Sequence, residues 1–341
     1  MQKLKAVLVG CGSMSKEWIR VATSIPNLEL VGLVDIFEPN AVARASEFKL
    51  EHVQIGSDLA KMLEITKADL VFDCSIPEAH YDVALEAFKH GAHVLGEKPL
   101  ADSLARAIEM VNAAQASNRV HAVMQNRRFD PNILRVKQFL ETNQIGDVTT
   151  VNADFFIAAH FGGFRDSMKH VLLLDMAIHT FDQMRFMTGA DPVGVYCLEF
   201  NPKDSWYTQD SSAHCIFEMT NGMVFNYRGS WCSEGFHTTW ESDWRIIGTK
   251  GTVRWDGGAQ PKAQIVSETG GFFSKHSELE LPELEPQIIG GHEGLIKDFI
   301  AKLELQQPPA TPSSDNIKSL AMVFAAIESS ETGLRVPVRW T

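Results

Sequence analysis

The sequence predicts an α/β protein with an N-terminal domain over residues 1–125 and a C-terminal domain over residues 126–341. In the first, short apolar runs alternate with helical segments, which is typical of a parallel sheet covered by helices on both faces. In the second, strand candidates follow one another and are separated by turns that contain glycine, which is typical of a large, mainly antiparallel open sheet. A chain of 341 residues is long enough to bury two cores.

The elements of the first half follow in regular alternation. Pro39 fits the tolerated first turn of a helix, and Gly91 fits a C-terminal helix cap. Because most of the strands are continuous apolar runs, both faces of their sheet should be covered. The expected strands are residues 4–9, 29–34, 70–74, 93–96 and 120–124, and the expected helices are 16–25, 39–48, 79–90 and 104–117.

A glycine-rich turn joins the first strand to the first helix. Gly10 permits a tight turn, Gly12 lets a pyrophosphate approach the backbone, and the helix offers its N-terminal amides to the anion. Ser15 takes the third small position, and Asp35 ends the next strand, where a carboxylate accepts hydrogen bonds from ribose hydroxyls. Asp35 would repel a 2′-phosphate. We therefore predict a Rossmann domain that binds NAD rather than NADP, the alternative being a turn that binds nothing.

A lysine follows another of these strands, in the segment Glu97-Lys98-Pro99. In an open α/β sheet, ligands bind beyond the carboxyl ends of the strands. The residues before Lys98 are largely apolar, so its ammonium group would be partly desolvated and suited to proton chemistry. The alternative is an exposed lysine that ends a strand.

The second half is expected to form one wide sheet. Asn221-Gly222 between two strand candidates is a strong hairpin signal. A sheet with one exposed face often packs against a second subunit, so we expect a homodimer or homotetramer. The expected strands are residues 148–158, 193–200, 213–219, 223–231, 239–247 and 251–255, and two helices, 294–305 and 315–330, follow.

One helix, residues 171–187, interrupts these strands. Asp175, His179 and Asp182 are spaced four and three residues apart, so they should share one helix face. Apolar neighbours would enclose Asp175 and His179, and a carboxylate beside an imidazole raises its basicity. A polar stripe that faces solvent is the alternative. No third ligand accompanies them, so we predict no metal site.

Composition limits the possible partners. The net charge of −12 argues against nucleic acid, and no apolar run approaches the roughly 20 residues that span a bilayer, so no membrane partner is expected. The five cysteines are odd in number and include no Cys-x-x-Cys pair. We expect reduced thiols in a cytoplasmic protein.

Further short motifs accompany the glycine turn, Asp35 and the Asp175/His179 pair. They are Pro77-Glu78-Ala79-His80, Glu97-Lys98-Pro99, Asn126-Arg127-Arg128-Phe129 and Gly248-Thr249-Lys250-Gly251-Thr252. Together the set resembles the glucose–fructose oxidoreductase, inositol dehydrogenase and rhizopine-catabolism (Gfo/Idh/MocA) family over essentially the whole chain. The resemblance implies an NAD-binding Rossmann domain, followed by a substrate-binding and oligomerisation domain with a large open sheet.

The resemblance also implies roles for individual residues. Lys98 would hold the reacting hydroxyl and favour its ionised form, His179 would act as general base, and Asp175 would hydrogen-bond the substrate. Residues 170–174 depart from the glycine-rich stretch of many members, which leaves the shape of the pocket open. Cofactor contacts are expected from Gly10, Gly12, Ser13, Met14, Asp35, Ser75, Pro77, His80, Glu97, Lys98 and Gln125, and substrate contacts from Arg128, Phe156, His160, Arg165, Asp175 and His179.

The predicted function is that of an NAD-dependent dehydrogenase or reductase acting on a secondary hydroxyl of a sugar, glycoside or cyclic polyol. Aromatic side chains such as Phe156 suit the C–H faces of a sugar, and core packing is the alternative for each of them. Two other functions are compatible with the same fold: a glycoside hydrolase that oxidises its substrate transiently with bound NAD, and a non-enzymatic regulator that senses nucleotide.

Overall fold

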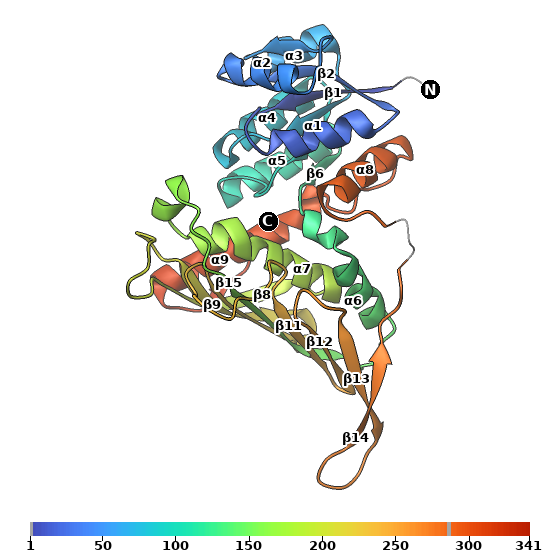
Figure 1. The fold of residues 1–341 in the computed structure, drawn as a ribbon, viewed down its shortest axis with the longest axis vertical. Helices are drawn as coiled ribbons and strands as arrows, with labels where there is room; N and C mark the ends of the chain where they lie inside the picture. The colour runs from blue at the N-terminus through green and yellow to red at the C-terminus, as the bar shows by residue number, and fades with distance from the viewer. Residues whose placement is uncertain (1–2, 285–287) are drawn as a thin grey trace. The chain divides into compact units, whose positions relative to one another are not determined.

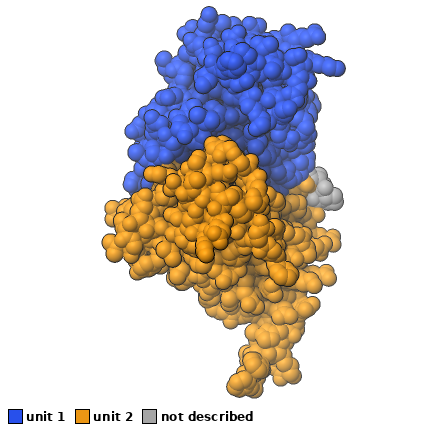
Figure 2. Space-filling model, turned by 60° about the vertical axis from the view of Figure 1, so that its left-hand side comes forward, with its two compact units in different colours: residues 1–129, 289–317, 341 blue, residues 130–288, 318–340 orange. Residues whose placement is uncertain are grey.

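The computed structural model describes residues 3–284 and 288–341 and divides into two compact units. The first contains Met1–Phe129, Ile289–Ile317 and Thr341, and the second contains Asp130–Ile288 and Lys318–Trp340. Figure 2 colours the two units. The fold class predicted from the sequence is confirmed in both, a parallel sheet in the first and a mainly antiparallel sheet in the second.

The first unit is built on a six-stranded parallel sheet with the order β3-β2-β1-β4-β5-β6. The order reverses beside β1, which lies between β2 and β4. This reversal is the switch point of a Rossmann sheet, where the carboxyl ends of the strands leave room for a ligand. The strands are β1 Leu4–Val9, β2 Leu28–Val34, β3 Gln54–Gly56, β4 Leu70–Asp73, β5 His93–Gly96 and β6 His121–Val123.

Helices connect these strands, and four of them match the predicted segments to within two residues. One helix, α3, and the three-residue strand β3 were not predicted. β3 is largely exposed and lacks the apolar run by which the other strands are recognised. The helices are α1 Ser15–Ser24, α2 Glu38–Glu47, α3 Leu59–Thr66, α4 Pro77–Lys89 and α5 Leu104–Ala116.

A helix from the C-terminal part of the chain completes the first unit. The sequence analysis assigned this segment to the second domain, but α8 (Gly291–Glu304) packs in the core formed by Trp18 and Phe72. The apolar face of α8 supplies Leu295, Ile296, Phe299 and Ile300 to that core. The pattern of apolar residues gives the buried face of a helix, but it does not give the sheet against which that face packs.

The second unit contains a nine-stranded sheet with the order β14-β13-β12-β11-β7-β10-β9-β8-β15. Only the described pair β7–β10 is parallel, and the Asn221-Gly222 hairpin between β9 and β10 is confirmed. Helices α6 (Pro131–Glu141), α7 (Ile178–Thr188) and α9 (Ser313–Thr332) lie along one face of the sheet (Figure 1). The strands are β7 Val148–Phe156, β8 Pro192–Phe200, β9 Ser212–Met219, β10 Val224–Ser230, β11 Asp243–Gly248, β12 Gly251–Trp255, β13 Lys262–Glu268, β14 Lys275–Glu280 and β15 Val336–Pro337.

Neither of the last two long strands, β13 and β14, was predicted. Both are mostly exposed and polar, so neither shows the apolar alternation that marks a half-buried strand. β13 pairs with β12 and β14 pairs with β13, and backbone hydrogen bonding to these neighbours places both strands in the sheet. Among the described residues, no helix is both long and apolar enough to cross a membrane.

We predict that Phe299→Ala lowers the free energy of unfolding of the first unit by about 3–5 kcal/mol, because it empties a fully buried site in α8. Urea unfolding of the full chain would measure the loss, and hydrogen exchange would locate it in peptides of β1 and β4. Leu305→Ala, at an exposed position just beyond α8, should cost less than about 0.5 kcal/mol. Faster exchange in β9 and β10 alone would contradict the assignment of α8 to the first unit.

Candidate active site

The glycine turn of the first unit meets the requirements of a dinucleotide site. Gly10 has a φ of +85°, and a Cβ there would lie 2.6 Å from the backbone of Cys74 and Ser75, so only glycine fits. A Cβ on Gly12 would meet no atom within 4 Å. The backbone of Gly12 therefore borders open space, as an approaching pyrophosphate requires.

The first turn of α1 is suited to an anion. The N-cap residue is Met14, and no side chain caps the amides that follow. Ser15 turns its hydroxyl back to the carbonyl oxygen of Gly12, with an Oγ–O distance of 2.6 Å, which fixes the turn. Ser13 and Met14 are exposed beside it. Uncapped amides and the helix dipole both favour a bound phosphate here.

Asp35 is held in place by the turn that it faces. Its Oδ2 accepts the amide of Cys11 at 2.8 Å, and its Oδ1 accepts the amide of Phe37 at 2.9 Å. Oδ1 also accepts Nδ2 of Asn40 at 3.3 Å, so the second lone pair of Oδ2 is the acceptor for a ribose hydroxyl. The nearby Arg44 donates to the carbonyls of Cys11 and Gly12 and pairs with Glu47. The guanidinium of Arg44 is therefore engaged by the turn and by Glu47. A 2′-phosphate would instead meet the negative charge of Asp35.

The carboxyl ends of β4 and β5 are joined by His80. Its ring is buried, with Nδ1 2.9 Å from the carbonyl oxygen of Pro99 and Nε2 3.2 Å from that of Ser75. A neutral imidazole carries one N–H, so His80, predicted as a cofactor contact, donates to one of these two carbonyls, and its ring lies between the backbones of Ser75 and Pro99. Pro77 begins α4 just beyond Ser75.

Glu97 and Lys98 directly follow β5. The carboxylate of Glu97 accepts the indole Nε1 of Trp18 at 2.8 Å and the amide of Lys98 at 3.3 Å. The Lys98–Pro99 peptide bond is cis. Gln125, which is 1 % exposed, follows β6. The predicted cofactor residues thus gather at the carboxyl ends of β1, β2, β4, β5 and β6 of a single sheet.

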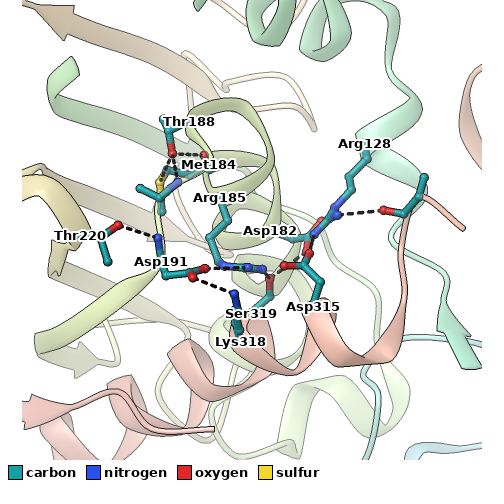
Figure 3. Close-up of polar contacts among 12 residues, drawn as sticks. Arg128, Asp182, Met184, Arg185, Thr188, Asp191, Thr220, Asp315, Lys318 and Ser319 are labelled. Carbon is teal, nitrogen blue, oxygen red and sulfur yellow. Dashed lines mark hydrogen bonds and ion pairs between the residues drawn. The ribbon is translucent and has the colours of Figure 1, made fainter. Parts of the chain in front are cut away.

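Arg128 was predicted to contact substrate, and the structure places it in a network of the first unit. Its guanidinium donates to the carbonyl of Ala310 at 3.0 Å and to Asp315 Oδ2 at 2.7 Å (Figure 3). The residue is 5 % exposed. These contacts tie the short 3₁₀ helix Asn126–Phe129 to the loop before α9 and to the first turn of α9, and a substrate contact by Arg128 stays a prediction.

In the second unit, the helix predicted over residues 171–187 begins as a π-helix and continues as an α-helix. Residues Leu172–Ala177 form a π-helix that contains Asp175, and α7 begins only at Ile178. π-helical turns are rare and occur frequently at functional sites. The side chain of Asp175 is 16 % exposed, and His179 is 7 % exposed. The pair is therefore enclosed, and the alternative of a stripe that faces solvent is wrong.

Asp182, the third member of the predicted stripe, belongs to a buried structural network (Figure 3). It accepts the hydroxyl of Ser319 at 2.8 Å, and Ser319 accepts Arg185 Nη1 at 2.9 Å. Arg185 and Lys318 in turn contact the carboxylate of Asp191 at 3.1 and 2.7 Å. This network joins α7 to α9, and Asp182 takes part in it through its hydrogen bond with Ser319.

Arg165 forms a two-point ion pair with Asp175. Its Nε lies 2.8 Å from Oδ2 and its Nη2 3.3 Å from Oδ1, which raises the pKa of the guanidinium further above its ordinary value. The rings of Phe161 and Phe164 have their centroids 5.0 and 4.9 Å from the guanidinium carbon. Arg165 was predicted as a substrate contact, and the sequence did not predict its ion pair with Asp175.

The other predicted aromatic and imidazole contacts are spread over the same unit. Phe156 is half-buried, at the end of β7. The side chain of His160 is 64 % exposed, and its ring stacks on Trp206 with centroids 3.8 Å apart. Arg165 and Asp175 are therefore in direct contact, whereas His160 stacks on Trp206 and is exposed.

The segment where the chain departs from the family pattern begins at His170. This residue adopts a left-handed conformation, with φ of +53°, which ordinarily favours glycine. Its Nδ1 lies 2.7 Å from the buried carboxylate of Glu199, a contact that raises the pKa of His170. Burial raises the pKa of Glu199. The contact with Glu199 thus holds the side chain of His170 in this backbone conformation. Within residues 3–284 and 288–341, no cluster of His, Cys, Asp and Glu could hold a metal ion.

Comparison with known proteins agrees with this fold and site. Residues 4–125 match the model of the Gfo/Idh/MocA oxidoreductase family with its NAD-binding Rossmann fold, and residues 133–254 match that of the Gfo/Idh/MocA C-terminal domain. The chain belongs to the Gfo/Idh/MocA family. It is an NAD-binding oxidoreductase, and the predicted family, enzyme class and cofactor are confirmed.

Individual relatives match nearly the whole chain. An inositol 2-dehydrogenase from Salmonella typhimurium is 24 % identical, over 97 % of this chain and 95 % of its own. A 1,5-anhydro-D-fructose reductase from Ensifer adhaerens is 23 % identical over 96 % of each chain. The crystal structure of an oxidoreductase from Agrobacterium radiobacter, in complex with NAD+, L-tartaric acid and magnesium, superimposes with a TM-score of 0.86 at 21 % identity, covering 99 % of both chains. At 21 % identity, this structural similarity supports the assignment of the fold.

We predict that the protein binds NADH at least about tenfold more tightly than NADPH, since Asp35 faces the ribose side of the turn and a tenfold ratio needs only about 1.4 kcal/mol of repulsion. Fluorescence titration of the two reduced cofactors measures the ratio, and Asp35→Ser should bring it close to one. Asp82→Ser, at an exposed position on α4, is the control and should keep the ratio. Tighter binding of NADPH by the unaltered protein would overturn the assignment.

Proposed function

We propose that this oxidoreductase transfers hydride between nicotinamide and the carbon that carries a secondary hydroxyl of a sugar, glycoside or cyclic polyol. The observation that carries the proposal is the enclosed Asp175–Arg165 pair, with His179 four residues further along the chain. Such groups hydrogen-bond hydroxyls and accept a proton. The names of two relatives, an inositol 2-dehydrogenase and a 1,5-anhydro-D-fructose reductase, support a cyclic substrate rich in hydroxyls.

The chemistry requires a proton acceptor from the protein. Oxidation of an alcohol removes a hydride and a proton, and bound NAD accepts the hydride alone. We assign the proton to His179, whose imidazole can accept it near neutral pH. We assign to Lys98 a hydrogen bond that holds the hydroxyl and stabilises its ionised form.

Arg165 and Asp175 are proposed to recognise the other hydroxyls of the substrate. The ion pair uses Nε and Nη2 of Arg165, and we assign Nη1 to a substrate hydroxyl. Phe161 and Phe164, which are 44 % and 69 % exposed, flank this guanidinium. Their rings offer apolar faces to the C–H side of a sugar.

A panel of sugars, polyols and glycosides, assayed with NAD, tests the proposal. Net formation of NADH with at least one member is the expected result. Cleavage of a glycoside without net NADH would support the hydrolase that oxidises its substrate transiently. Binding of NADH without turnover of any member would favour a nucleotide-sensing regulator.

We predict that Lys98→Met lowers kcat by at least about a hundredfold, the usual contribution of an acid–base group. The dissociation constant for NADH, measured by fluorescence, should change less than about threefold, because the glycine turn and Asp35 are untouched. Lys89→Met is the matched control, since the side chain of Lys89 is 72 % exposed at the end of α4. Near-normal turnover by Lys98→Met would refute the assignment.

We also propose that the open face of the nine-stranded sheet joins copies of the chain into a homodimer or homotetramer. Tyr196, Leu198 and Phe200 of β8 alternate on this exposed face, and Tyr196 pairs across the strands with exposed Ile216 of β9. A contiguous apolar surface of this kind marks a protein interface.

Leu198→Glu should shift the protein toward the monomer, because it places a charge in the middle of this apolar surface. Light scattering coupled to size exclusion measures the mass. Phe272→Glu, at a position 95 % exposed in the β13–β14 loop, is the control and should leave the mass unchanged. A monomeric unaltered protein would rule the interface out.

A further inference from the structure

Two of the five cysteines lie opposite each other on neighbouring strands of the second unit. Cys197 of β8 pairs with Cys215 of β9 in the antiparallel register. Their sulfur atoms are 3.4 Å apart, and both thiols are free. The two groups that a disulfide bond requires are therefore already in contact.

The hydrogen-bond pattern of β8 brings the two cysteine side chains close together. In an antiparallel sheet, opposed residues alternate between pairs that exchange backbone hydrogen bonds and pairs that do not, and the Cα atoms of the second kind are only about 4.5 Å apart. The amide of Cys197 donates to Ser329 Oγ of α9 at 2.9 Å. Two residues further on, the amide of Glu199 donates to Ser330 Oγ at 2.8 Å. Because these amides donate to α9 rather than to β9, Cys197 and Cys215 form a pair of the second kind.

The spacing of such a pair suits a disulfide bond. The Cα atoms of two residues joined by a disulfide are usually about 4.4–6.8 Å apart, and the sulfur atoms are about 2.05 Å apart. A Cα distance of about 4.5 Å falls within this range, so the backbone needs no large movement. The sulfur atoms must approach each other by about 1.4 Å, and rotation of the two side chains about their Cα–Cβ bonds supplies this movement.

The two thiols differ in their access to solvent. Cys215 is 1 % exposed and donates its S–H to the sulfur of Cys197. Burial, followed by this hydrogen bond, raises the pKa of the Cys215 thiol well above its ordinary value. Cys197 is partly exposed. A reagent in solution therefore reaches Cys197 first, and Cys215 reacts only afterwards, from within the protein.

The cysteine pair lies on the face of the sheet that the helices cover. Successive side chains of a strand point to opposite faces, and the neighbours of Cys197 in β8, Tyr196 and Leu198, are exposed on the open face. On β9, Phe217 shares the face of Cys215 and is fully buried. An assembly through the open face therefore leaves the access to this pair unchanged.

We propose that Cys197 and Cys215 are a site of reversible oxidation, at which a disulfide bond links β8 to β9. With glutathione disulfide as the oxidant, the thiolate of Cys197 attacks one sulfur of the reagent, forms a mixed disulfide and releases one glutathione. Cys215 then gives up its proton, attacks the sulfur of Cys197 and releases the second glutathione. The two protein thiols lose two protons and two electrons, and the reagent takes up both as two glutathione thiols.

The bond would act on a strand that contacts the candidate active site of the second unit. Glu199 lies two residues after Cys197 on β8, and its carboxylate holds His170. The carbonyl of His170 accepts the amide of Leu174, in the π-helix that contains Asp175, at 3.0 Å. Oxidation would thus restrain the strand that holds the start of this helix. The disulfide itself involves no substrate, so the proposal does not depend on the proposed function.

Mass spectrometry of tryptic peptides tests the bond directly, because each cysteine lies in a different peptide. Residues 186–203 contain Cys197, and residues 204–228 contain Cys215. The folded full chain is treated with glutathione disulfide, alkylated with iodoacetamide and digested without reductant. We expect these two peptides joined, with the mass of two hydrogen atoms missing, and separated again after dithiothreitol. Recovery of both only as separate peptides, or a link between any other two cysteines instead, would refute the proposal.

Single substitutions test the order of the two steps. Cys215→Ser should keep one glutathione on Cys197, because the thiol that displaces it is missing. Cys197→Ser should leave Cys215 unmodified, since Cys215 is buried. Cys232→Ser is the matched control and should still form the link, because the sulfur of Cys232 contacts the hydroxyl of Ser211 at 3.1 Å rather than either thiol of the pair. A Cys197 that stays unmodified in Cys215→Ser would overturn the proposed route.

Discussion

The cofactor site depends on the close approach of the β1 turn to the end of β4. With Gly10 at a φ of +85°, its Cα lies against the backbone of Cys74 and Ser75, and no side chain fits between them. This contact brings together the carboxyl ends of the two strands at the switch point of the sheet. The Cys11 amide then donates to Asp35, and the ring of His80 contacts the carbonyls of Ser75 and Pro99, so the turn, the carboxylate of Asp35 and the segment after Lys98 lie together around this contact.

How much of this was predictable depends on the range of the interactions. The strands of the first sheet, the glycine turn and Asp35 follow from local patterns, because a buried parallel strand is an apolar run and a dinucleotide turn needs glycine at fixed positions. β13 and β14 are held in the sheet by backbone hydrogen bonds, β13 to β12 and β14 to β13. Such pairing leaves no apolar pattern in their own sequences. The packing of α8 in the first unit rests on contacts between segments far apart in the chain.

The same distinction holds within the candidate site. The apolar neighbours of Asp175 and His179 favoured an enclosed pair, which spacing alone did not decide, and both residues are enclosed. Spacing alone could not predict the π-helix at Leu172–Ala177 or the partner Arg165, both of which depend on the fold around them. The contact of His292 Nε2 with Glu97 Oε1, at 3.7 Å, was missed for the same reason, because nothing near His292 in the sequence indicates Glu97. Partners of buried carboxylates are set by tertiary packing.

The charges within each unit bear on the kind of substrate proposed above. In the first, the carboxylate of Glu97 lies beside Lys98 and His292, and in the second, Asp175 is paired with Arg165. Each carboxylate is thus compensated by a cation of its own unit, and neither needs a charged substrate to balance it. Under the proposed function, hydroxyls of a neutral polyol would donate to one carboxylate oxygen and accept from one nitrogen. A sugar with a hydroxyl that is absent or misplaced would then bind less well, because an enclosed polar group would lose a hydrogen bond.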